Sequence, residues 1–208
     1  MLSFHLLAAT GAGVLLVIAP AFGQAPARVR GTITAISDGG LTVKERDGRT
    51  LTLKTGLYTA YAYVVPSNLD AIKVNDFVGS AVKGPLNSMV AVELAIIPEN
   101  MRAGRISLYD WDSLPDPTAR QTSDMTTTRM TNGIVSAEKV GAAGLTLTVT
   151  YDDGSKSFRI AVPHNAPIVR YVLSDRSAVA IGSAVMIKTN PGDQAGLVTV
   201  GKGVTPPM

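Results

Sequence analysis

The sequence predicts an all-β fold in which two small β-barrel domains follow one another. Three observations lead to this prediction. Apolar residues alternate with polar ones in short runs, Asp-Gly pairs separate such runs, and one order of features occurs twice within the 208 residues. Alternation with a period of two is typical of half-buried strands. Beyond the N-terminal region no segment has a sustained helical period, although one helical turn is expected within residues 68–74.

The N-terminal segment, residues 1–23, is predicted to be a signal peptide. It contains no Lys, Arg, Asp or Glu, and residues 6–18 form an apolar run. Ala21 and Gly23 supply the small residues of a cleavage site before Gln24. The segment also lacks the basic residues that usually begin a signal, so a retained membrane anchor is the alternative. The apolar run is shorter than the roughly 20 residues of a spanning helix. These features predict a periplasmic or secreted protein with no membrane span after cleavage.

An internal repeat covers residues 28–98 and 131–203. Residues 30–36 (RGTITAI) correspond to 132–138 (NGIVSAE), and residues 71–78 (AIKVNDFV) correspond to 178–185 (AVAIGSAV). The turns at Asp47-Gly48 and Asp153-Gly154 also correspond, and Asp-Gly between alternating runs is a strong hairpin signal. Five or six short strands per copy bury a core best when they close into a barrel. We therefore predict two OB-like barrels; a small sandwich is the alternative.

The segment between the copies, residues 99–130, is predicted to be an irregular linker. It contains Pro115, Pro117 and the single tryptophan of the chain, in the sequence Tyr109-Asp110-Trp111-Asp112. Long loops without regular structure are often functional. We predict that these four residues bind a ligand or partner. The alternative is that the linker only pins the two barrels together.

The sequences RGTITAI, GLTVKERDGR and IKVNDFVGSA, with LYDWD in the linker and VGKGVTPPM at the end, resemble a family of exported bacterial proteins built from OB-like repeats. The resemblance covers nearly all of the chain beyond the signal and implies the fold. Some members of this family are labelled as metal transport components. A His often precedes the aromatic linker motif in that family, and this chain has Leu108 there.

The residue inventory gives little support to catalysis or to a metal centre. The chain has no cysteine, and beyond the signal its one histidine is His164, in a predicted turn without a nucleophile motif. A tight transition-metal site usually needs several imidazole or thiolate ligands. We therefore predict no catalytic residue, no metal site and no cofactor.

Three tyrosines of the first copy, Tyr58, Tyr61 and Tyr63, are a second candidate binding surface. OB-like barrels often stack bases or sugars on aromatic residues. However, Lys and Arg are spread evenly and the net charge is only +3, so no nucleic-acid partner is expected.

The sequence thus predicts an exported, non-enzymatic binding or scaffolding protein, whose partner is an envelope protein or a small ligand. A metal-handling accessory protein that uses His164, linker methionines and carboxylates is the alternative.

Overall fold

The computed structural model describes residues 28–102, 108–121 and 124–206, and these residues form an all-β protein. The predicted signal peptide and its cleavage site lie outside the described residues. Within the described residues the chain forms thirteen strands and three single 3-10 turns, η1 (Leu69–Ala71), η2 (Glu99–Met101) and η3 (Arg176–Ala178). The strands are β1 (Arg28–Ser37), β2 (Gly40–Glu45), β3 (Thr50–Lys54), β4 (Ala60–Pro66), β5 (Phe77–Lys83), β6 (Met89–Ile97), β7 (Leu108–Pro115), β8 (Met125–Gly141), β9 (Gly144–Tyr151), β10 (Lys156–Pro163), β11 (Ile168–Ser174), β12 (Ala184–Asn190) and β13 (Gln194–Gly201). No helix within these residues is long and apolar enough to span a membrane.

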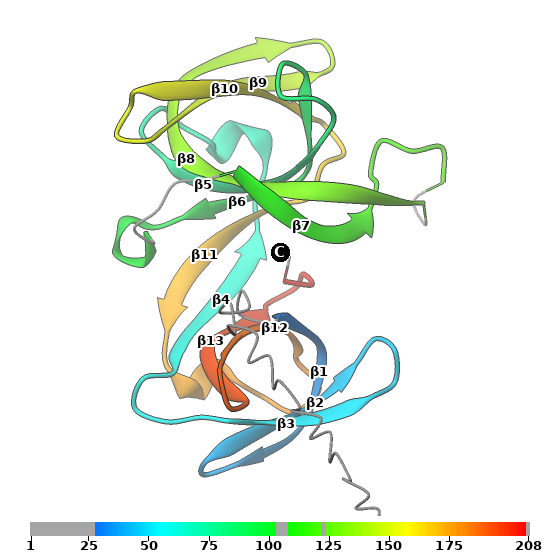
Figure 1. Cartoon of the computed structure of the whole chain (residues 1–208), viewed down its shortest axis with the longest axis vertical. Coiled ribbons are helices and arrows are strands. Elements are labelled where there is room, and N and C mark those ends of the chain that lie inside the picture. Colours follow the sequence, from blue (N-terminus) through cyan, green and yellow to red (C-terminus); the bar gives the residue numbers. More distant parts are fainter. Residues whose placement is uncertain (1–27, 103–107, 122–123, 207–208) are drawn as a thin grey trace, which may run out of the picture.

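Five strands close into a β-barrel, here called barrel B. Its strand order is β10-β9-β8-β5-β6, and parallel pairing of Ile160 with Met89 and of Ala161 with Val90 joins β10 to β6. The apolar sides of these strands form one buried core, which includes Val135, Leu147 and Ile160. Barrel B lies at one end of the long axis of the molecule (Figure 1).

Strands β1, β2, β3, β12 and β13 form a second ring, here called ring A. Ring A lies at the other end of the molecule (Figure 1). Its order is β3-β2-β1-β12-β13, and the parallel pair Gln194–Lys54 joins β13 to β3. The Lys54 amide donates a hydrogen bond of 2.9 Å to the carbonyl of Asp193 at this closure. A separate buried core, which includes Ile33 and Leu53, fills the ring.

Strands β4 and β11 cross between the two ends and pair with each other in antiparallel fashion. Each also pairs in parallel with the last strand of one ring, β4 with β13 and β11 with β6. A third core cluster surrounds this crossing and contains Val64 and Tyr171. The crossing strands therefore link ring A and barrel B into one continuous sheet.

The predicted domain boundaries, 28–98 and 131–203, do not separate the two rings. Strands β5 and β6 belong to the first copy in sequence but pair with β8 and β10 of the second. In the same way, β12 and β13 pair with β1 and β3. The two copies therefore exchange their last two strands, and neither barrel B nor ring A is built from one contiguous repeat.

The predicted irregular linker, 99–130, is also corrected in part. Residues Leu108–Pro115 form β7, which pairs with the first half of β8 as an antiparallel hairpin. Its alternation is broken by a register shift between Asp110 and Ser113, which hid the strand pattern in the sequence.

The turns predicted from the sequence are found in the structure. Both Asp-Gly pairs connect paired strands, and Gly48 and Gly154 adopt positive φ of 90° and 85°. The helical turn expected within residues 68–74 is η1, which Asn68 caps by accepting a hydrogen bond of 3.1 Å from the Ala71 amide.

Candidate functional site

The aromatic cluster predicted as a binding site packs against β1. The guanidinium carbon of Arg28 lies 3.7 Å from the centroid of the Trp111 ring, and Tyr109 meets that ring edge-on at 5.7 Å. Asp112 accepts from Arg28 at 2.9 Å and also pairs with Arg30. Tyr109 is 40% exposed and Asp110 is exposed. The structure thus brings the four predicted residues together, and it turns Trp111 and Asp112 toward the protein itself.

The ion pairs of the β7 hairpin reach both rings. Asp112 binds β1 of ring A, whereas Asp116, just beyond β7, binds Lys83 at the end of β5 in barrel B. Burial raises the pKa of each carboxyl, but the hydrogen bonds and nearby cations outweigh burial and lower the pKa below its usual value. These contacts favour the interpretation that the segment pins the two rings together.

The three predicted tyrosines lie in different surroundings. Tyr58 is 94% exposed in the loop after β3. Tyr61 and Tyr63 share one face of β4 and pack against the core of ring A, and the Lys202 ammonium lies 3.7 Å from the Tyr63 ring centroid. Part of the surface of Tyr61 and of Tyr63 is therefore covered by other residues of the protein. Tyr58 lies apart from them on the loop, so the three tyrosines do not share one environment.

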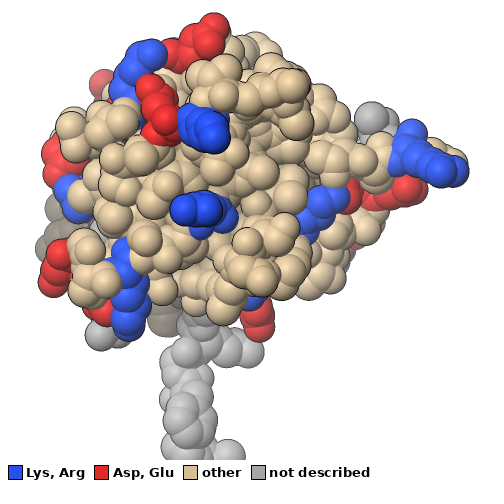
Figure 2. All heavy atoms as spheres, turned by 90° about the horizontal axis from the view of Figure 1, so that it is seen from above, with Lys and Arg blue, Asp and Glu red and all other residues tan. Residues whose placement is uncertain are grey.

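Charged residues do not form a patch of one sign on the face of the molecule seen from above. Figure 2 shows basic and acidic side chains interspersed among uncharged ones there. This distribution agrees with the even spread of charge along the sequence.

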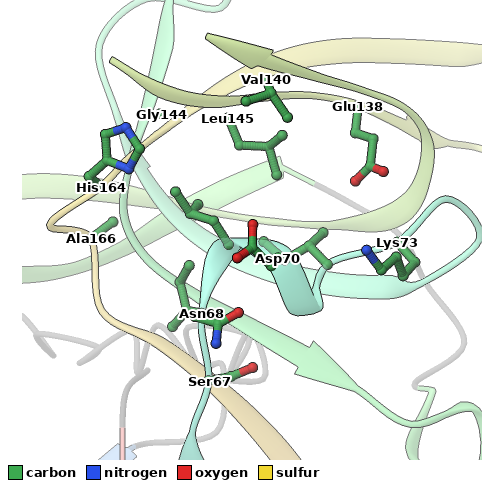
Figure 3. Close-up of a pocket in the computed structure, with 13 residues that line it drawn as sticks. Ser67, Asn68, Asp70, Lys73, Glu138, Val140, Gly144, Leu145, His164 and Ala166 are labelled. Atoms are coloured by element: carbon green, nitrogen blue, oxygen red, sulfur yellow. The ribbon is translucent and has the colours of Figure 1, made fainter. Parts of the chain in front are cut away.

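A cavity of about 410 Å³ lies at the open end of barrel B (Figure 3). Its inner wall is apolar and includes the buried side chains of Ile72, Leu145 and Ile168. The exposed side chains at its rim are mostly polar or charged, and they are Asn68, Asp70, Lys73, Glu138 and His164, with Val140 beside them. An apolar interior with a few polar groups at its edge is the usual composition of a small-molecule site.

Part of the cavity wall is the tip of the β8–β9 hairpin. In ring A the corresponding β1–β2 hairpin is short, because residues 38 and 39 alone separate the paired residues Ser37 and Gly40. In barrel B residues 140–145 separate the corresponding pair, Lys139 and Thr146, so the hairpin extends further. The extension contributes Val140, Gly144 and Leu145 to the cavity.

The corresponding end of ring A is crossed by an arginine. Arg176 of η3 donates a hydrogen bond of 2.8 Å to Thr55 Oγ1 and another to the Ser37 carbonyl. Its counterpart in η1 is Leu69, which lines the cavity of barrel B. Arg176 thus ties η3 to the ends of β1 and β3, and Leu69 leaves the equivalent place in barrel B open.

The charged groups at the rim are also specific to barrel B. Ring A has uncharged residues at the equivalent positions, counted along the paired strands and turns. Ser177 corresponds to Asp70, Ala180 to Lys73, Ile36 to Glu138 and Leu57 to His164. No ion pair is formed by Asp70, Lys73 or Glu138 within the described ranges. The corresponding end of ring A therefore forms without these rim charges.

Comparison with protein families, curated proteins and solved structures finds no match for this chain. The resemblance to exported proteins with OB-like repeats therefore stays a prediction.

The cavity contains residues that the sequence analysis did not select. His164, treated there as a turn residue, lines the cavity, but its imidazole makes no hydrogen bond or ion pair with other described residues. Figure 3 places it on the side opposite Glu138 and Lys73. Within the described part of the chain, no three His, Asp or Glu side chains are grouped as a metal site would require. A signal for the cavity did exist in the sequence: its rim residues are positions where the two copies differ.

Proposed function

We propose that this protein is an exported, non-enzymatic binding protein of two OB-like modules, and that it holds a small ligand in the open end of barrel B. The observation that carries the proposal is the difference between the two equivalent ends. Arg176 ties one end together, whereas the other has Leu69, a longer hairpin and a cavity of about 410 Å³. Ligand sites of small molecules commonly have about 300–1,000 Å³.

The architecture supports a rigid binding site. Barrel B takes β5 and β6 from one copy and β8, β9 and β10 from the other, and the β7 hairpin ties both rings through Asp112 and Asp116. A site on such a framework is preformed, which lowers the entropic cost of binding. The aromatic residues of the hairpin then serve mainly to hold the rings, and Tyr109 with Asp110 remains a proposed contact for an envelope protein.

The proposal is tested by titrating the ¹⁵N-labelled chain from Gln24 onward with a defined panel of amino acids, dipeptides, sugars, polyamines and nucleotides. Chemical-shift changes of backbone amides around the cavity are expected for at least one class. Leu69→Arg, which imitates ring A, should abolish them. Val140→Arg should do so as well, and because Val140 is 82% exposed this variant leaves the core untouched.

Arg176→Leu is the matched control, since it removes the arginine from the other ring. It should leave binding to barrel B unchanged. The proposed function is wrong if no compound class shifts the amides around the cavity, or if the shifts persist in both Leu69→Arg and Val140→Arg.

A further inference from the structure

The cavity of barrel B also indicates which chemical class it binds, an inference that rests on the proposed function. We infer that its ligand is zwitterionic: an amino acid or short peptide with an aliphatic side chain, whose ammonium and carboxylate groups both contact the rim.

The inner wall requires an apolar part of the ligand. Ile72, Leu145 and Ile168 form the bottom of the cavity and are already 93% or more buried, whereas Leu69 beside them is only partly buried and keeps exposed apolar surface. Val140 on the hairpin tip is 82% exposed and adds further uncovered apolar surface to the cavity wall. Covering this surface with an aliphatic side chain removes apolar area from water, at roughly 25 cal/mol per Å². A sugar or another fully hydroxylated molecule would gain little from these contacts.

The rim requires charges of both signs. Figure 3 shows the Asp70 carboxylate directed into the middle of the cavity, with Glu138 and Lys73 on one side of it. Two carboxylates attract an ammonium group and repel phosphate and other anions, whereas the Lys73 ammonium attracts a carboxylate. Because none of the three forms an ion pair within the described residues, their charges are available to a ligand.

The internal copy supports assigning these charges to binding. Ser177, Ala180 and Ile36 stand at the positions of Asp70, Lys73 and Glu138, and the same arrangement of turn, hairpin and strand forms there without any of the three charges. The fold therefore tolerates uncharged residues at all three positions. These three charges occur at the open end of barrel B and have no charged counterparts at the equivalent positions of the end that Arg176 crosses.

Isothermal titration with L-leucyl-L-leucine tests the inference. Two analogues each remove one ligand charge: N-acetyl-leucyl-leucine lacks the ammonium group, and leucyl-leucinamide lacks the carboxylate. Each analogue should bind about fivefold or more weaker than the free dipeptide, because each loses one ion pair at a partly exposed site. Added salt should weaken binding of the free dipeptide.

Variants then assign each ligand charge to its residue. Lys73→Gln should weaken binding of the free dipeptide but not of leucyl-leucinamide, which has no carboxylate for Lys73 to attract. Asp70→Asn or Glu138→Gln should weaken binding of the free dipeptide but not of the acetylated dipeptide, which has no ammonium group. Asp38→Asn and Lys54→Gln are exposed controls in ring A and should change nothing.

Failure of the inference is distinguishable from failure of the proposed function. Suppose that putrescine or N-acetylglucosamine binds to the parent protein but not to Leu69→Arg, and that the dipeptide does not bind. The proposed ligand class is then wrong, whereas the proposed binding site is supported. The inference is also wrong if the dipeptide binds with an affinity that none of the three charge variants alters.

Discussion

Val64 and Tyr171 face each other at the centre of the antiparallel ladder between β4 and β11. Around this pair the strand pairings repeat: β1 with β12 corresponds to β8 with β5, and β3 with β13 corresponds to β10 with β6. The pair therefore marks an approximate two-fold relationship between the two copies. Each copy completes the other, much as two subunits do in a strand-exchanged dimer.

This exchange predicts that one copy alone does not form a folded monomer. The fragment 24–102 lacks the strands that cover β1 and β5, so it leaves long edges unpaired. We expect size-exclusion chromatography with light scattering and circular dichroism to show an unfolded or dimeric fragment. The intact chain should unfold in one transition in urea. A folded monomer of 24–102 would contradict the exchanged topology.

Tyr171 provides a second prediction, at alkaline pH. Burial raises the pKa of its phenol to about 12, so the folded state favours the neutral form. A raised folded pKa contributes stability that is complete below the unfolded value of about 10 and is lost as the pH rises toward 12. We expect the free energy of unfolding to fall over this range, followed by urea titration, and Tyr171→Phe to reduce that fall. Tyr58→Phe, at a 94% exposed position, is the control and should not change it.

The sequence predicted the strands well but could not predict how they are exchanged. The hairpin at Asp47-Gly48 follows from local chemistry, because glycine adopts the positive φ of the turn without strain. Local chemistry does not, however, predict whether β5 pairs with β1 of its own copy or with β8 of the other copy. Gly31 and Gly133 occupy equivalent places on those two strands, so both offer a similar edge and local pattern does not distinguish them.

The cavity was missed for a related reason. Asp70, Lys73 and Glu138 are each ordinary surface residues in their own segment, and they approach one another because η1 and the β8–β9 hairpin meet at the end of the barrel. Trp111 was noticed because it is a rare residue in a polar segment, but its packing partner Arg28 lies far away in sequence. Comparison of the two copies position by position is the sequence signal that identifies the rim.

A third prediction concerns the close approach of β1 to β2 at Gly31. A Cβ added there would lie 2.1 Å from the Lys44 carbonyl oxygen, so the strands would have to separate. We expect Gly31→Ala to lower the free energy of unfolding by about 2 kcal/mol or more, measured by urea denaturation. Gly39→Ala is the matched control, because no heavy atom lies within 4 Å of its added Cβ. Equal stability of the two variants would show that the strands do not approach as described.

The last prediction tests the pin between β7 and β1 through its dependence on pH. The pKa of Asp112 is lowered in the folded state, because hydrogen bonds and charge from Arg28 and Arg30 outweigh the effect of burial. A lowered folded pKa contributes stability that is present above the unfolded value of about 3.9 and is lost as the pH falls through the folded value. Asp112→Asn should therefore destabilise the protein at pH 7 by about 1–3 kcal/mol, as expected for lost charge-assisted hydrogen bonds.

The difference between this variant and the parent should shrink as the pH falls through the folded pKa of Asp112, because the parent carboxyl is then also protonated. Urea denaturation followed by Trp111 fluorescence measures both the stability and the state of the pin, since Trp111 is the single tryptophan of the chain. Asp110→Asn is the control: Asp110 is exposed beside Asp112 on β7 and has no ion pair among the described residues. If Asp112→Asn and Asp110→Asn lose equal stability at pH 7, the Arg28–Asp112 contact does not hold the hairpin, and Trp111 would then be free to act as the partner contact predicted from the sequence.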